Sequence, residues 1–81
     1  MYETIRNFHL DFAEQRGLES TYCPSEVARA CFSKDWRSQM DLVRQVADEL
    51  VADEKLVVMQ KGEIISAKAV DAKGAIRLRR K

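Results

Sequence analysis

Two helix starts stand close together in the stretch CPSEVARACFSKDW, residues 23–36. Pro24 suits the first position of a helix, because the N–H that proline lacks has no partner inside a helix there. Glu26 follows two residues later, where its carboxylate favours the positive end of the helix dipole. A turn comes next, and Asp35 is a good N-cap for a helix that begins one residue later. The stretch therefore predicts a short helix over 24–32, a turn, and a second helix.

The second helix is expected over residues 36–53. Its apolar residues recur at alternating four- and three-residue steps, which places them on one face. These residues are Trp36, Met40, Val43, Ala47 and Leu50. Two helices joined by a turn of three or four residues form a helix-turn-helix.

The residues before this motif predict one more helix, over 2–16. Its apolar stripe consists of Tyr2, Ile5, Phe8 and Phe12. Gly17 follows, in the position where a left-handed residue closes a helix. We expect His9 to border the core or to face the solvent. Residues 18–22 are too few for a helix and predict an extended connection or a short strand.

The residues after the motif predict strands. The β-branched run at 56–60 favours a strand, and Lys61-Gly62 is a candidate turn after which Ile64 and Ile65 can continue the pairing. Residues 75–79 alternate apolar with basic side chains, which is typical of a half-buried strand. The sequence therefore predicts an α+β fold with three helices and a small antiparallel β-hairpin, the strands of which are 56–60 and 75–79.

This order of elements resembles a winged helix-turn-helix domain over most of the chain, with the hairpin as the wing. A narrower set of motifs is similar to a family of short, uncharacterised bacterial proteins. The motifs are CPSEVAR (23–29), DWR (35–37), QKG (60–62), VD (70–71) and GAIRLR (74–79). That family usually has Gly-Pro-Ile-Arg in the last motif, where this chain has Ala75 in place of the proline. Winged helices often bind DNA, but many serve only in protein docking or dimerisation, so the fold alone does not decide the function.

Length and composition limit the possible classes of protein. The chain has 81 residues, of which 46% are hydrophobic and 33% charged. This is enough for one core and one domain, residues 1–81, and it excludes a disordered chain. No segment approaches the ~20 apolar residues of a membrane span, and no signal segment opens the chain, so we expect no membrane partner.

The net charge of +1 conceals an uneven distribution. Residues 1–54 contain six basic and eleven acidic residues, a net charge of −5. Residues 55–81 contain eight basic and two acidic residues, a net charge of +6. Such asymmetry favours a nucleic-acid or acidic partner, although the two parts can also simply attract each other within the fold.

Cysteine and histidine do not predict a metal, cofactor or catalytic site. Cys23 and Cys31 are eight residues apart, which is ~12 Å along one helix and too far for a disulfide. Free thiols suit the cytoplasm. A zinc site needs three or four ligands, commonly in close pairs that this chain lacks. Without a phosphate-binding loop or a nucleophile–base pair, we expect no enzyme.

The winged-helix resemblance implies a set of nucleic-acid contacts. Helix 36–53 would enter the major groove, where Arg37 and Arg44 are candidates for bonding guanine. Ser25 could bond a phosphate at the start of its helix. The candidates for phosphate contacts on the wing are Lys61, Lys68, Lys73, Arg77 and Arg79.

Two alternatives stay open. Arg37 and Arg44 can instead pair with Asp41 and Asp48 at four-residue spacing on the helix surface. The bulky residues of the first helix can also exceed what a small core covers, which would favour a protein-interaction or homodimerisation module.

Overall fold

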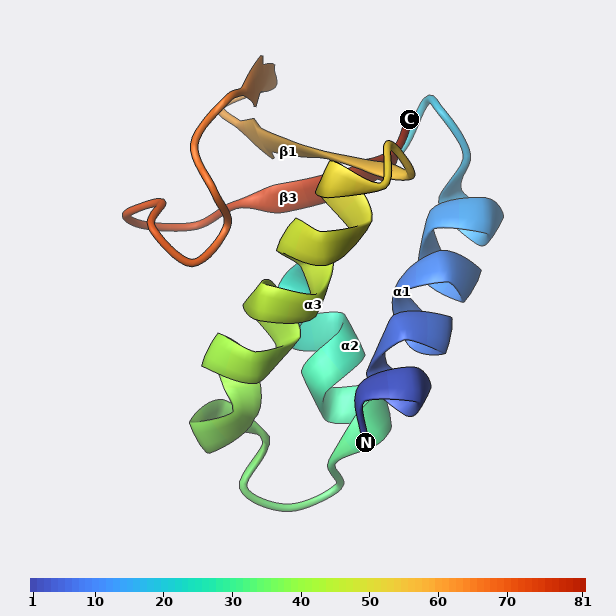
Figure 1. Cartoon of the computed structure of the whole chain (residues 1–81), viewed down its shortest axis with the longest axis vertical. Helices are drawn as coiled ribbons and strands as arrows, with labels where there is room; N and C mark the ends of the chain where they lie inside the picture. The colour runs from blue at the N-terminus through green and yellow to red at the C-terminus, as the bar shows by residue number, and fades with distance from the viewer.

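The computed structural model describes all 81 residues, as three α-helices, one 3-10 helix and three strands. The α-helices are α1 (Tyr2–Arg16), α2 (Pro24–Cys31) and α3 (Met40–Ala52), and the 3-10 helix η1 (Trp36–Gln39) precedes α3. The strands are β1 (Leu56–Gln60), β2 (Glu63–Ile65) and β3 (Arg77–Arg80). Figure 1 shows the helices grouped together, with β1 and β3 crossing one end of the group. The chain is therefore an α+β protein with a small antiparallel sheet.

The sheet has three strands in the order β2-β1-β3, so β1 is central. The predicted antiparallel pairing of 56–60 with 75–79 is present as β1 with β3, and the candidate turn at Lys61-Gly62 adds a third strand, β2, which the predicted two-stranded hairpin lacked. Gln60 pairs with Glu63 across a two-residue turn, in which Lys61 and Gly62 have φ of 52° and 81°. Two left-handed residues match the twist of hairpin strands. β3 pairs with the other edge of β1, and it begins at Arg77 rather than at residue 75.

The connection between α1 and α2 is tied to the sheet at one residue. The Tyr22 N–H donates to the Leu78 carbonyl at 2.8 Å, and the Leu78 N–H donates to the Tyr22 carbonyl at 2.7 Å. This isolated bridge extends the sheet beyond β3. The short strand that was one alternative for residues 18–22 is thus a single antiparallel bridge.

The predicted helix 36–53 does not begin as an α-helix. Asp35 has a left-handed φ of 56°, and the Ser38 N–H donates to its carbonyl at 3.2 Å, which closes a tight turn. Four residues of 3-10 helix follow before α3 begins, and α3 ends at Ala52. The first turn is tightened because Ser38 also donates its hydroxyl to the Asp35 carboxylate at 2.7 Å. The preceding helix ends one residue earlier than predicted, with Phe32 as its C-cap.

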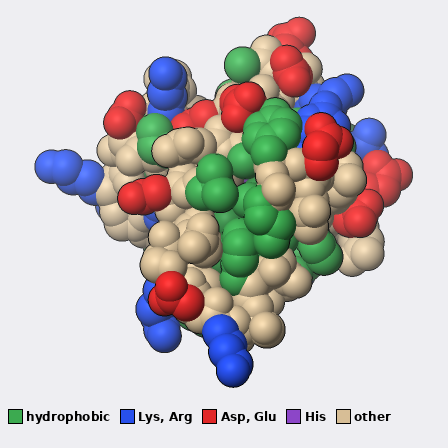
Figure 2. Space-filling view, turned by 60° about the horizontal axis from the view of Figure 1, so that its bottom comes forward, with side chains coloured by type: hydrophobic (Ala, Val, Ile, Leu, Met, Phe, Trp, Pro, Cys, Tyr) green, Lys and Arg blue, Asp and Glu red, His purple; other side chains and the backbone are tan.

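The core contains fourteen hydrophobic residues from all three helices, β1, β3, the connection between α1 and α2, and the loop before β3. In α3 the buried face coincides with the predicted apolar stripe. In α1 the buried face is rotated relative to the predicted stripe. Ile5, His9 and Ala13 are buried, while Phe8 and Phe12 are half-buried. Tyr2 is 39% exposed. Figure 2 shows the molecule with the lower end of Figure 1 turned toward the viewer. On this face, hydrophobic side chains reach the surface as a patch between charged groups.

His9 is fully buried, which corrects the prediction that it would border the core or face the solvent. Its Nε2 lies 3.0 Å from the Val43 carbonyl oxygen, and its Nδ1 lies 2.8 Å from the Tyr22 hydroxyl. A carbonyl can only accept, so Nε2 carries the proton and Tyr22 donates to Nδ1. Burial lowers the pKa of His9 to about 4. The neutral imidazole therefore joins α1, α3 and the connection at Tyr22.

The longest helix, α1, has 15 residues. This is fewer than the ~20 that a membrane-spanning helix needs, and no helix of the structure is long and apolar enough to cross a bilayer.

Candidate nucleic-acid interface

Three of the predicted phosphate contacts lie around one open hollow beside the β1–β2 hairpin. Lys61, Lys73 and Arg77 line this hollow of about 480 Å³, and the remaining lining residues are Gln60, Gly74 and Ala75. No acidic side chain lines it. We call this surface the basic hollow. Cationic side chains with no carboxylate between them favour an anion.

Hydrogen bonds fix the basic hollow on two sides. The Gln60 side-chain amide donates to the Lys73 carbonyl at 2.8 Å, which ties the loop before β3 to the end of β1. The Arg77 guanidinium donates to the Thr21 hydroxyl at 2.9 Å and to the Thr21 carbonyl at 3.2 Å. Arg77 therefore lies beside the connection between α1 and α2 and remains exposed.

Arg44 neither points outward as a candidate base contact nor pairs with Asp48, which were the two interpretations of the sequence. Its Nη1 donates to the carbonyls of Ala69 and Ala72 at 3.0 and 3.3 Å. It does not reach outward toward a base, and it makes no ion pair with Asp48. Asp48 instead accepts from the N–H groups of Ala69 and Val70 at 2.6 and 3.2 Å. Both side chains of α3 hold the loop that carries Lys68 and Lys73.

The other predicted contacts are dispersed. Ser25 donates its hydroxyl to Cys23 Sγ at 3.1 Å. Arg79 donates to the Arg80 carbonyl at 3.1 Å. The Arg37 guanidinium carbon lies 4.6 Å from the centre of the Trp36 ring, and it forms no ion pair with Asp41. Of the eight candidate residues, the structure brings together only the three that line the basic hollow.

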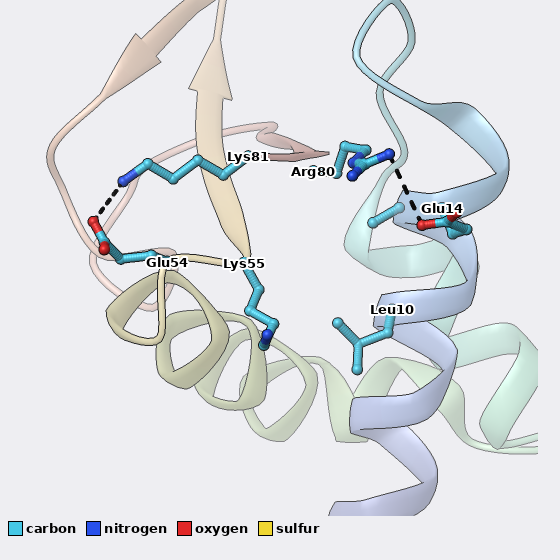
Figure 3. Close-up of a pocket in the computed structure, with 7 residues that line it drawn as sticks. Leu10, Glu14, Glu54, Lys55, Arg80 and Lys81 are labelled. Atoms are coloured by element: carbon cyan, nitrogen blue, oxygen red, sulfur yellow. Dashed lines mark hydrogen bonds and ion pairs between the residues drawn. The ribbon is translucent and has the colours of Figure 1, made fainter.

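The last two residues face acidic side chains of the helical part (Figure 3). Arg80 pairs with Glu14 at 3.9 Å, and Lys81 pairs with Glu54 at 2.8 Å. These pairs border a second hollow, of about 300 Å³, which Lys55 also lines. The contact with Lys81 lowers the pKa of Glu54. The expected attraction between the acidic and basic parts therefore occurs at this end of the sheet, where the charges cancel.

The exposed side of α3 carries negative charge. Asp41 and Glu49 are exposed, and Asp53 follows at the end of the helix. Carboxylates repel phosphate, so this side of the helix is unsuited to the major groove.

The thiols lie in structural positions. Cys23 and Cys31 are free and half-buried, and burial raises the pKa of the Cys31 thiol, which disfavours the thiolate. No three histidine, cysteine, aspartate or glutamate side chains are arranged to hold a metal ion.

The model of a protein family of unknown function, DUF3253, matches residues 2–81. The chain belongs to DUF3253. No curated protein matches it. The resemblance to an uncharacterised family is thus confirmed, and membership in DUF3253 assigns no activity.

Several residues that hold basic side chains of this DUF3253 protein in place were not predicted from the sequence. Thr21 and Gln60 are uncharged and sit in unremarkable positions, so only the packing reveals their bonds to Arg77 and Lys73. The sequence only weakly indicates the contact that Arg29 makes. It lies in the last turn of α2, and its guanidinium carbon is 4.6 Å from the centre of the Trp36 ring.

Proposed function

We propose that the chain is a small, non-catalytic winged-helix domain that binds the phosphate backbone of duplex DNA, with the basic hollow as its main contact. The element order supports the winged-helix assignment, since three helices, a bridge at Tyr22 and the antiparallel pair of β1 and β3 follow in the expected sequence. The hairpin of β1 and β2 and the loop before β3 would together form the wing.

The observation that carries the proposal is the grouping of Lys61, Lys73 and Arg77 around one hollow with no acidic lining. Exposed amines on a hairpin tip and on a fixed loop can contact successive phosphates. Such contacts release counterions from DNA and supply affinity without sequence information. The hydrogen bonds of Gln60 and Thr21 hold this surface in shape before any ligand arrives.

Backbone binding fits the structure better than sequence-specific readout by α3. Arg44, one of the two candidate base readers, is bonded to the loop carbonyls. The exposed residues of α3 include the carboxylates of Asp41 and Glu49. We therefore expect little discrimination between duplexes of different sequence.

Fluorescence anisotropy with a labelled 20-base-pair duplex of mixed sequence, over a series of salt concentrations, tests this proposal. We expect binding at low salt that weakens as salt rises. In the double variant K61Q/K73Q, the slope of log binding constant against log salt concentration should be smaller in magnitude by about 2, because two phosphate contacts are lost. The matched control is K55Q, which removes one lysine charge from the second hollow. Absence of binding at low salt, or equal slopes for wild type and K61Q/K73Q, would contradict the proposal.

The hydrophobic patch of Figure 2 favours one other function, the binding of a second copy of this chain. Burial of exposed apolar surface drives association. Light scattering over a concentration range distinguishes the two functions. A mass of 9.3 kDa at all concentrations supports the DNA-binding monomer, and a mass that doubles as concentration rises supports the dimer.

A further inference from the structure

Three of the eight arginines have no polar partner, and two of these three contact one aromatic ring. Five of the eight arginines make hydrogen bonds or ion pairs, namely Arg16, Arg44, Arg77, Arg79 and Arg80. Arg6, Arg29 and Arg37 make none. Arg6 lies alone on α1, whereas Arg29 and Arg37 meet at the same aromatic ring.

The ring of Trp36 is a platform for both guanidinium groups. Each guanidinium carbon lies 4.6 Å from the ring centre, so the two are at most about 9 Å apart. Trp36 is half-buried and packs against the core, which fixes the ring. Arg29 comes from the last turn of α2 and Arg37 from η1, so the turn between these elements brings them together. We call these three residues the arginine pair on Trp36.

No carboxylate neutralises this pair. The Asp35 carboxylate accepts a hydrogen bond from Ser38 at 2.7 Å, and Asp41 forms no ion pair. Contact with an aromatic face leaves the N–H groups of a guanidinium available to an acceptor. Arginine N–H groups match the geometry of phosphate oxygens, with which they form bidentate, charge-assisted bonds. Two like charges at one ring repel each other, and a bound anion would relieve that repulsion.

We propose that the arginine pair on Trp36 is a second phosphate-binding site, which contacts the same duplex as the basic hollow. This inference rests on the proposed function. Arg37 precedes Arg44 by seven residues along η1 and the start of α3, roughly 12 Å, and Arg44 holds the loop of Ala69. Phosphates follow one another every ~3.4 Å along each strand. One duplex can therefore extend from the loop to the arginine pair.

Trp36 is the only tryptophan of the chain, so its emission reports directly on the arginine pair. We would titrate the protein with the unlabelled 20-base-pair duplex, follow Trp36 fluorescence, and measure affinity separately by anisotropy. For wild type we expect an emission change that saturates together with the anisotropy. R29Q/R37Q should lose about tenfold or more in affinity at 0.1 M salt, with a slope smaller by about 2. The variant R6Q is the control, because it removes an equally unbonded arginine from α1.

The outcomes separate the two proposals. If K61Q/K73Q weakens binding while R29Q/R37Q behaves like R6Q and Trp36 emission stays constant, the arginine pair is not a phosphate site and the proposed function stands. If anisotropy detects no duplex binding, the proposed function fails, and tripolyphosphate then tests the pair alone. An emission change with tripolyphosphate that R29Q/R37Q abolishes supports the site, and no change overturns it.

Discussion

At the residue scale, the neutral imidazole of His9 is the polar centre of an otherwise apolar core. Both ring nitrogens have partners, and they belong to a carbonyl of α3 and to the hydroxyl of Tyr22. Protonation would place a charge among apolar residues and would turn Nδ1 into a donor. The Tyr22 hydroxyl would then have to accept, and its own hydrogen would lose its partner. Solvation and hydrogen bonding thus both favour the neutral ring.

Stability should therefore fall as the pH drops from 7.5 to 5. The pKa of His9 is about 4 in the folded protein and ~6.5 in the unfolded chain. The unfolded chain binds more protons between these two values, so acid favours unfolding. We expect a loss of about 2 kcal/mol in the free energy of unfolding at pH 5, measured by urea denaturation.

His9 is the only histidine, so its ring protons give an unambiguous NMR titration. A midpoint near pH 4 would support this account, and a midpoint near 6.5 would overturn it. The variant His9→Phe is the control for denaturation, since its stability should change little over the same pH range if it folds.

At the element scale, α3 determines where the wing loop lies. Asp48 accepts from two consecutive N–H groups of the loop, and Arg44 donates to two of its carbonyls. Ala69, between these bonds, is fully buried. A loop that is bonded at both donors and acceptors cannot move away from α3 without losing all four bonds. This arrangement fixes the backbone that carries Lys73.

The variant Asp48→Ala distinguishes this positioning role from simple electrostatics. Removal of a carboxylate raises the net charge by one unit, which by itself should tighten binding to DNA. We expect weaker binding instead, because the loop loses its anchor, and a loss of about 1–2 kcal/mol in the free energy of unfolding. Faster amide hydrogen exchange at Ala69 and Val70 would locate the effect.

The matched control for this experiment is Asp41→Ala, which removes an exposed carboxylate of the same helix that accepts no hydrogen bond. This variant should bind duplex DNA slightly more tightly than wild type. Equal affinities for Asp41→Ala and Asp48→Ala would show that the anchor has no part in binding.

The elements that can be predicted are those determined by residues close together in the sequence. The bounds 2–16 follow from apolar periodicity and from Gly17, which has a positive φ of 68°. The alternation in residues 75–79 correctly placed Ile76 and Leu78 in the core. The turn at Lys61-Gly62 and the apolar pair Ile64 and Ile65 indicated continued pairing at β2, although a strand of three residues is too short for a periodic pattern. The 3-10 turn at Trp36 depends on a serine–aspartate contact that helical propensity does not reveal.

At the scale of the whole molecule, the positive charge of residues 55–81 divides between two ends of the sheet. Arg80 and Lys81 pair with acidic residues of the helical part, whereas the basic hollow has no acidic lining. The sequence could predict that the charge is concentrated in this part of the chain. It could not predict which residues are neutralised, because ion pairs such as Lys81 with Glu54 depend on the pairing of β3 with β1, which brings Lys81 beside the turn that follows α3.

The central claim is that the basic hollow, and not the exposed side of α3, contacts DNA. NMR chemical-shift mapping of the amides during titration with the 20-base-pair duplex tests it most directly. We expect the largest shifts on residues 60–62 and 73–77, with smaller ones near Arg29 and Trp36. Shifts concentrated on α1, or at Asp41 and Glu49 of α3, would contradict it.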